Sequence, residues 1–151
     1  MSSTPELRHA ESPSRDNRTA LHENEIGTII VECAIELHRE LGPGLFETVY
    51  ETTLATTLRL RGLRVQRQAS VTIQYHGERF DEGFRTDLIV GDRVIVELKS
   101  VERVIPAHKK QVLTYLRLTG LKLGYLLNFG EASMRDGITR IINGHLDPGP
   151  P

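Results

Sequence analysis

Hydrophobic residues recur along the chain with two different periods, and the change between them separates a helical opening from a strand-rich remainder. Helical spacing relates one early set of apolar residues: Ile26, Ile29, Ile30, Cys33, Leu37 and Leu41. The "LGPGL" stretch that follows predicts the end of this helix. A second helix is expected from near Phe46 to Gly62, where glycine supplies a usual stop. The pattern therefore predicts two adjacent helices, with Cys33 packed in the core.

The period changes to two after the second helix. Val71, Ile73 and Tyr75 alternate with polar residues, and "HGE" at 76–78 predicts a turn. We expect further strands at about 80–85, 86–90, 94–99 and 122–129, and an edge strand at 137–142. Pro106 suits the first turn of a third helix that ends at Gly120. This order of elements predicts an α/β fold with a mixed central sheet flanked by helices.

The stretch "RTDLIVGDRVIVELKS" at 85–100 interrupts two aliphatic runs with charged residues. Residues two apart in a strand share a face, so Glu97 and Lys99 point to the same side of the sheet. A three-residue loop, 91–93, would gather the aliphatic residues of both strands on one side and place Asp87 opposite Glu97, whereas a two-residue loop would send Asp87 to the apolar side. The hydrophobic pattern therefore favours the three-residue loop.

Opposed carboxylates destabilise a sheet unless a cation lies between them. Oxygen ligands suit Mg²⁺, with Mn²⁺ as an alternative, and such an ion can activate water for attack on a phosphodiester. The ammonium group of Lys99 can orient that water or stabilise developing negative charge. The alternative interpretation of an isolated Glu-x-Lys pattern is an exposed surface pair on a hairpin.

Composition limits the classes of protein that remain. The 151 residues, with 38% hydrophobic content, fit one domain, expected at 21–144 between tails at 1–20 and 145–151. The net charge of -1 lacks the basic excess typical of many nucleic-acid-binding proteins, so such contacts must be local. A single cysteine excludes an intramolecular disulfide. No apolar run is long enough to span a membrane, and a cytoplasmic protein is expected.

Several blocks together resemble a known family. "GLFETVY" at 44–50 fits a GxxExxY signature through Gly44, Glu47 and Tyr50. "FRTDLIV", "VIVELKS", "HKKQVLTYL" and "LLNFG" look like the remaining blocks of the GxxExxY family of the PD-(D/E)XK nuclease superfamily. The resemblance covers about 26–142 and implies the RecB-like, restriction-endonuclease-like core, α-β-β-β-α-β, with an extra N-terminal helix. Thr86 stands where the proline of the superfamily's name would be.

The resemblance also implies roles for individual residues. Asp87 and Glu97 match the family's metal-binding acids, and Lys99 matches its catalytic lysine. Glu47 matches a helical glutamate that contributes to the metal site or its surroundings. Gln111 and Tyr115 resemble a QxxxY element that belongs to the catalytic site of related nucleases. His108 lies on the same predicted helical stripe, at i, i+3 and i+7, and is a weaker candidate.

These observations predict a metal-dependent nuclease acting on DNA or RNA, with a homodimer or protein partner expected for so small a domain. The alternative is an inactive or weakly active nucleic-acid-binding or accessory module that keeps the fold. Basic residues near the second and third helices offer a phosphate track or simply a solvated surface: Arg59, Arg61, Arg64, Arg67, Lys109 and Lys110.

Overall fold

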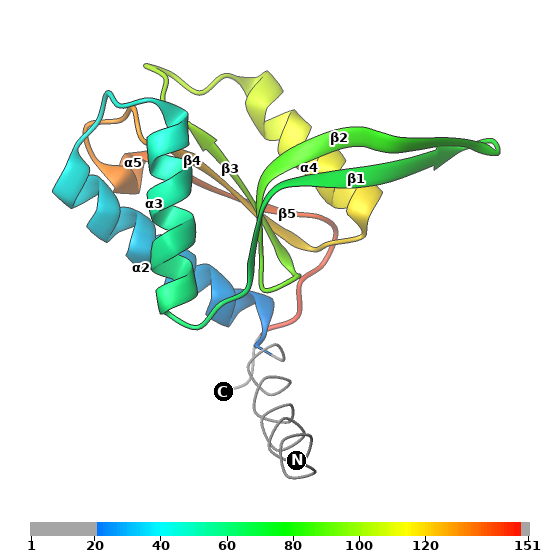
Figure 1. Ribbon diagram of the computed structural model, residues 1–151, viewed down its shortest axis with the longest axis horizontal. Coiled ribbons are helices and arrows are strands. Elements are labelled where there is room, and N and C mark those ends of the chain that lie inside the picture. Colours follow the sequence, from blue (N-terminus) through cyan, green and yellow to red (C-terminus); the bar gives the residue numbers. More distant parts are fainter. Residues whose placement is uncertain (1–20, 149–151) are drawn as a thin grey trace, which may run out of the picture.

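A computed structural model describes residues 21–148 and contains a mixed five-stranded sheet with helices on both faces (Figure 1). The strands are β1 (Val65–Tyr75), β2 (Glu78–Val90), β3 (Val94–Lys99), β4 (Leu123–Asn128) and β5 (Ile138–Ile142), in that spatial order. Only the β3–β4 pair is parallel among these strands. The predicted α/β class and the mixed, helix-covered sheet are confirmed.

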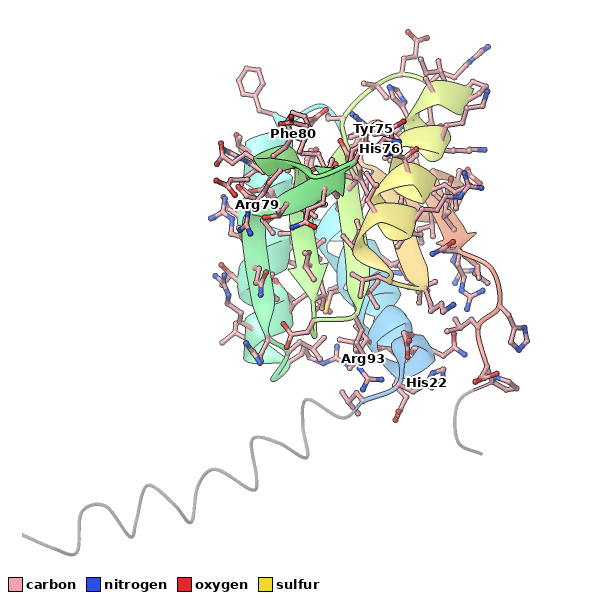
Figure 2. All side chains as sticks on the ribbon, turned by 90° about the vertical axis from the view of Figure 1, so that its right-hand side faces the viewer. His22, Tyr75, His76, Arg79, Phe80 and Arg93 are labelled. Atoms are coloured by element: carbon pink, nitrogen blue, oxygen red, sulfur yellow. The ribbon has the colours of Figure 1, made fainter. Side chains whose placement is uncertain are left out.

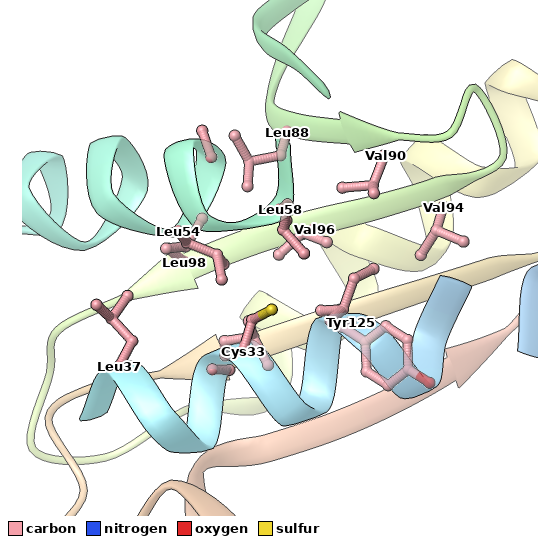
Figure 3. Packing of buried hydrophobic residues seen from close by; sticks show 14 of the residues in the cluster. Cys33, Leu37, Leu54, Leu58, Leu88, Val90, Val94, Val96, Leu98 and Tyr125 are labelled. Atoms are coloured by element: carbon pink, nitrogen blue, oxygen red, sulfur yellow. The ribbon is translucent and has the colours of Figure 1, made fainter. Parts of the chain in front are cut away.

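Two helices, α2 (Glu23–Leu41) and α3 (Glu47–Leu60), cover one face of the sheet (Figure 1). Their apolar stripes pack against inward-facing residues of the strands, including Leu88, Val96 and Leu98 (Figure 3). Cys33 is fully buried in this core, as its helical spacing predicts. Burial of apolar area is the main stabilising contribution of such a core.

Tyr50 fixes the junction between the two helices. Its ring stacks on Phe129 with centroids 4.3 Å apart, and its hydroxyl donates to Gly42 O at 2.6 Å. The same hydroxyl oxygen accepts the Leu45 N–H at 3.1 Å. The turn between the helices is therefore held by a buried side chain, and Tyr50 belongs to the core.

The opposite face carries α4 (Pro106–Thr119), which connects β3 to β4. Val112 and Leu116 of α4 pack on Ile95 in a second, smaller core. Gly124 of β4 permits this close approach, because a Cβ atom there would lie 2.9 Å from Val112 Cγ1. The short helix α5 (Met134–Gly137), which the hydrophobic pattern does not predict, precedes β5.

The β1–β2 hairpin extends well beyond the body of the domain (Figure 1). Its end carries the exposed aromatic residues Tyr75 and Phe80, together with His76 and Arg79 (Figure 2). The segments 80–85 and 86–90, predicted as separate strands, form the single strand β2, and β1 begins at Val65 rather than near Val71. The hairpin is thus longer than its alternating segment indicates.

The connection between β2 and β3 has the predicted three-residue length. Val90 pairs with Val94 and Leu88 with Val96, so Asp87 and Glu97 occupy the next opposing positions. Residues 91–93 form the turn. The hydrophobic pattern correctly selects the register, because a shift by one residue would have placed the aliphatic side chains of the two strands on opposite faces of the sheet.

The predicted N-terminal tail, 1–20, lies outside the described residues, as do residues 149–151 of the predicted C-terminal tail, 145–151. Leu146, within the described part, packs against the larger core. None of the helices in 21–148 is long and apolar enough to cross a lipid bilayer.

Candidate active site

The carboxyl groups of Asp87 and Glu97 each accept a backbone hydrogen bond from the neighbouring strand. The Asp87 N–H donates to Glu97 Oε1 at 3.1 Å, and the Leu98 N–H donates to Asp87 Oδ2 at 2.9 Å. These two hydrogen bonds fix both carboxyl groups beside each other at the point where the hairpin leaves the body of the domain. The structure therefore brings together the two acids that the sequence predicts as a pair.

Glu97 is almost completely enclosed, with 6% of its surface exposed. Burial, the adjacent negative charge of Asp87 and a hydrogen bond to the Asp87 carboxyl raise the pKa of Glu97 to about 9, while the Asp87 N–H and the charge of Lys99 oppose this increase. A site with these two acids and no cation therefore holds a proton at neutral pH. A bound cation would favour loss of that proton.

Lys99 lies two residues after Glu97 at the end of β3 and is half-buried. Its ammonium group is close enough to lower the pKa of Glu97, which agrees with the predicted placement of both side chains on one face. Asn128 holds the segment that follows β3, because its amide exchanges hydrogen bonds of 3.0 and 2.9 Å with the backbone of Val101. The lysine therefore lies where two fixed strand ends meet.

Glu47 lies at the first turn of α3 and is exposed. Its Oε2 accepts the Ser100 N–H at 3.2 Å, while Ser100 Oγ donates to Leu45 O at 2.7 Å. Within residues 21–148, no group of three or more His, Cys, Asp or Glu side chains could hold a metal ion. Glu47 thus contacts the residue after Lys99, and its role as a third metal ligand stays a prediction.

Among the predicted site residues of α4, Tyr115 is the one whose hydroxyl group is influenced by the charges of the acid pair. Its ring stacks on Phe84 of β2, with centroids 4.2 Å apart and planes 9° from parallel. Burial, followed by the charges of Glu97 and Asp87, raises the pKa of the Tyr115 hydroxyl. Tyr115 therefore shares the electrostatic environment of the two acids.

The other two residues of that stripe differ from Tyr115. His108 Nδ1 accepts the Ile105 N–H at 3.2 Å and so caps the start of α4. Gln111 is exposed on the same helix. A capping role explains His108 without catalysis, whereas the role of Gln111 stays a prediction.

Gln68 and Glu51, which the sequence analysis does not single out, join the site through hydrogen bonds. Gln68 Nε2 donates to Glu51 Oε1 at 2.6 Å and to Asp87 Oδ1 at 3.2 Å. Arg67 binds the second oxygen of Glu51 through Nε at 3.1 Å and Nη2 at 3.0 Å. Glu51 precedes Leu54 by three residues and Leu58 by seven, which places it on the core-facing stripe of α3. An acid on such a stripe was the sequence signal that could have identified Glu51.

The predicted arginine track near the end of α3 is mostly engaged within the protein. Arg61 pairs with Glu32 at 2.9 Å, and Arg64 pairs with Asp92 at 2.9 Å. Arg59 donates to Val65 O at 2.8 Å. With Arg67 bound to Glu51, these side chains already have internal partners, which favours the interpretation as a structured surface over a free phosphate track.

Comparison with protein families places the chain in a known superfamily. A family model described as "PD-(D/E)XK nuclease superfamily" matches residues 24–141, which include both helices on the first face, the acid pair, Lys99 and α4. Comparisons with curated proteins and with solved structures gave no match. The narrower GxxExxY assignment stays a prediction. Because the model spans most of the chain and the fold has the corresponding mixed sheet and acid pair, this protein belongs to the PD-(D/E)XK nuclease superfamily.

Proposed function

We propose that this protein is a metal-dependent nuclease that hydrolyses phosphodiester bonds in DNA or RNA. The contact between the buried carboxyl group of Glu97 and the half-buried one of Asp87 is the observation that carries the proposal, together with Lys99 two residues farther along β3. Membership of a nuclease superfamily supports the reaction class, and members of this superfamily generally use divalent metals.

Asp87 and Glu97 fit a divalent cation. Their donor set is entirely oxygen, as Mg²⁺ and Mn²⁺ prefer. The pKa of Glu97 is raised first by burial and then by the charge of Asp87, and a cation bound between the two acids would offset both effects. When bound, such an ion supplies Lewis-acid polarisation of the phosphate and of an attacking water. Glu47 is a candidate for a further ligand or for a group that orients the site.

The protein's own groups divide the remaining work. Hydrogen bonds to Glu97 from Asp87 N and to Asp87 from Leu98 N hold the carboxyl oxygens in fixed directions. The ammonium group of Lys99 lies on the same face and would stabilise negative charge that develops on the attacking water or the phosphate. Tyr115, held flat against Phe84, bounds the same region, and Gln111 one helical turn earlier is a candidate contact for the substrate.

A nuclease assay tests this proposal. Single-stranded and duplex DNA, and RNA, would be incubated with the purified protein in Mg²⁺ or Mn²⁺, with EDTA and the Glu97→Gln variant as controls. Metal-dependent cleavage that EDTA and Glu97→Gln abolish would support the proposal. Cleavage that survives in Glu97→Gln would assign it to a contaminant or to another site. If the wild type binds nucleic acid without cutting it, the accessory-module interpretation replaces the nuclease.

A further inference from the structure

Gln68 connects the acid pair to Glu51, a buried glutamate of α3. Its side-chain amide donates to Glu51 Oε1 at 2.6 Å and to Asp87 Oδ1 at 3.2 Å. We propose that Gln68 is a positioning residue that orients the Asp87 carboxyl group for metal binding, with Arg67 and Glu51 as its anchor. This inference rests on the proposed metal-dependent function and adds residues that neither the sequence blocks nor the superfamily match assigns.

The backbone at Gln68 supports a dedicated role. Gln68 lies within β1 but has φ of 48°, in the left-handed region that non-glycine residues seldom occupy. The register is the same on both sides of Gln68, since Arg67 pairs with Leu88 and Ala69 with Thr86, which leaves Gln68 facing Asp87. A non-glycine residue held in this conformation destabilises the folded chain unless other contacts compensate. The side-chain contacts to Glu51 and Asp87 give a reason for that cost.

Glu51, the partner of Gln68 on α3, is held in place by burial and by Arg67. Glu51 is 6% exposed on the core-facing side of α3, and Arg67 binds its Oε2 through two nitrogen atoms. Arg67 Nη2 also donates to Thr52 Oγ1 at 2.9 Å. Because one oxygen of Glu51 is occupied by Arg67, its other oxygen is fixed in the direction of Gln68. The amide of Gln68 is thereby held in place before it meets Asp87.

Gln68 gives Asp87 a hydrogen-bond donor on its second carboxyl oxygen. Gln68 donates to Oδ1, while the Leu98 N–H donates to Oδ2 at 2.9 Å. A carboxylate that receives one donor on each oxygen is restricted in rotation, and its remaining lone pairs keep a constant direction. Such outer contacts usually raise metal affinity or activity by a factor of 10 to 100.

The chemistry of this position favours a neutral amide. A glutamine NH₂ group has two hydrogens, one for each of the carboxylates that flank it. A glutamate here would add a third negative charge between Glu51 and Asp87. A lysine would supply donors, but its positive charge would compete with a cation for Asp87. Glutamine joins the two carboxylates without changing the net charge of the site.

Metal titration tests the role of Gln68. Gln68→Met keeps the approximate length of the side chain and removes both N–H donors. Calorimetric titration with Mn²⁺ should show a Kd about tenfold or more above that of the wild type. Gln74→Met is the matched control, because Gln74 lies on the same strand, opposite Arg79 and toward the end of the hairpin. Its Kd should equal that of the wild type.

Gln68→Gly separates positioning from folding. Glycine adopts a φ of 48° without strain, so this variant should keep the hairpin while it loses the amide contacts. We expect Gln68→Gly to bind Mn²⁺ as weakly as Gln68→Met while its midpoint of urea unfolding stays at or above that of Gln68→Met. In turnover, kcat should fall with little change in KM for an oligonucleotide.

The outcomes distinguish this inference from the function on which it rests. If the wild type binds Mn²⁺ and both Gln68 variants bind it with unchanged Kd, the positioning role is wrong and the nuclease proposal stands. If weak binding appears only in variants that have also lost cooperative unfolding, Gln68 is a structural residue and the inference also fails. If the wild type neither binds Mn²⁺ nor cuts nucleic acid, both proposals fail together.

Discussion

The backbone N–H of Asp87 donates to Glu97 Oε1 across 3.1 Å, so one acid of the pair helps to hold the other. The adjacent Leu98 N–H returns a similar bond to Asp87. Each acid therefore sits on the backbone of the strand opposite, and small shifts in the β2–β3 register would separate the two carboxyl groups. The electrostatic consequences of this contact lead directly to measurable pH and metal effects.

The stability of the metal-free protein should depend on the proton held by Glu97. With the pKa of Glu97 raised from 4.5 to about 9, only the folded chain carries this proton between those values, so the free energy of unfolding should fall as pH rises through that range. A tenfold difference in proton affinity corresponds to about 1.4 kcal/mol. Urea unfolding in EDTA at about pH 6 and about pH 8.5 measures the fall.

Glu97→Gln should remove most of that pH dependence, because glutamine cannot lose the proton. Glu102→Gln, at an exposed position in the loop after β3, serves as the control and should retain the dependence of the wild type. Equal slopes for Glu97→Gln and the wild type would show that another group controls the pH response.

Metal binding should release a proton. At about pH 7 the metal-free site holds the Glu97 proton, and a cation between the acids would displace it, so roughly one proton should leave for each ion bound. Calorimetric titration with Mn²⁺ in two buffers of different ionisation enthalpy gives this number directly. Heats that are identical in both buffers would argue against a protonated Glu97.

Bound Mn²⁺ should also stabilise the fold. A free Mn²⁺ concentration a hundredfold above Kd should increase the free energy of unfolding by about 2.7 kcal/mol.

The register of the acid pair was predictable because a strand repeats every two residues. Only one loop length puts Leu88, Val90, Val94 and Val96 on one side, and burial of those residues selected it. The beginning of β1 was not predictable in the same way. Its first residues, "VQRQAS", lack alternation because Arg67 and Gln68 turn to Glu51 and Asp87 instead of following a simple apolar face.

The outer part of the candidate site depends on geometry that sequence spacing does not encode. Glu51 falls on the core-facing stripe of α3, but its partners Arg67 and Gln68 come from β1, sixteen and seventeen residues later, and no local pattern identifies them. The left-handed backbone at Gln68 has no local sequence signal, since glycine or asparagine would be the usual choice there. The family blocks identify the acids and the lysine, while the contacts that hold them come from the tertiary structure.

Thr86 presents a separate test of the core beside the site. It is fully buried, and its Oγ1 has no hydrogen-bond partner among the described residues. Thr86→Val keeps the branched shape and removes the hydroxyl, so it should increase the free energy of unfolding by about 1 kcal/mol. Thr86→Ser keeps the hydroxyl and loses a methyl group, and should be less stable than the wild type. Urea unfolding of the three proteins measures both changes, and a loss of stability in Thr86→Val would reveal a polar partner for Oγ1.

Replacing Lys99 should reduce the cleavage rate without reducing the affinity for the metal. Lys99→Met keeps most of the apolar stem and both acids but removes the ammonium group that we assign to the attacking water or the developing phosphate charge. Cleavage should fall by a factor on the order of a hundred or more, as for other preorganised electrostatic groups. The Kd for Mn²⁺ should stay the same or decrease slightly, because a positive charge near the cation is lost. Glu97→Gln should instead weaken both metal binding and cleavage.

Lys122→Met is the matched control for Lys99→Met, since Lys122 is an exposed lysine just before β4, outside the acid pair and the predicted phosphate track. Calorimetric titration beside an oligonucleotide turnover assay on these variants compares the two effects under one set of conditions. If Lys99→Met cleaves as fast as the wild type, the lysine is only a charge at the end of β3. If Lys99→Met loses metal binding to the same extent as Glu97→Gln, its ammonium group maintains the geometry of the acids, and the division of roles between Glu97 and Lys99 is wrong.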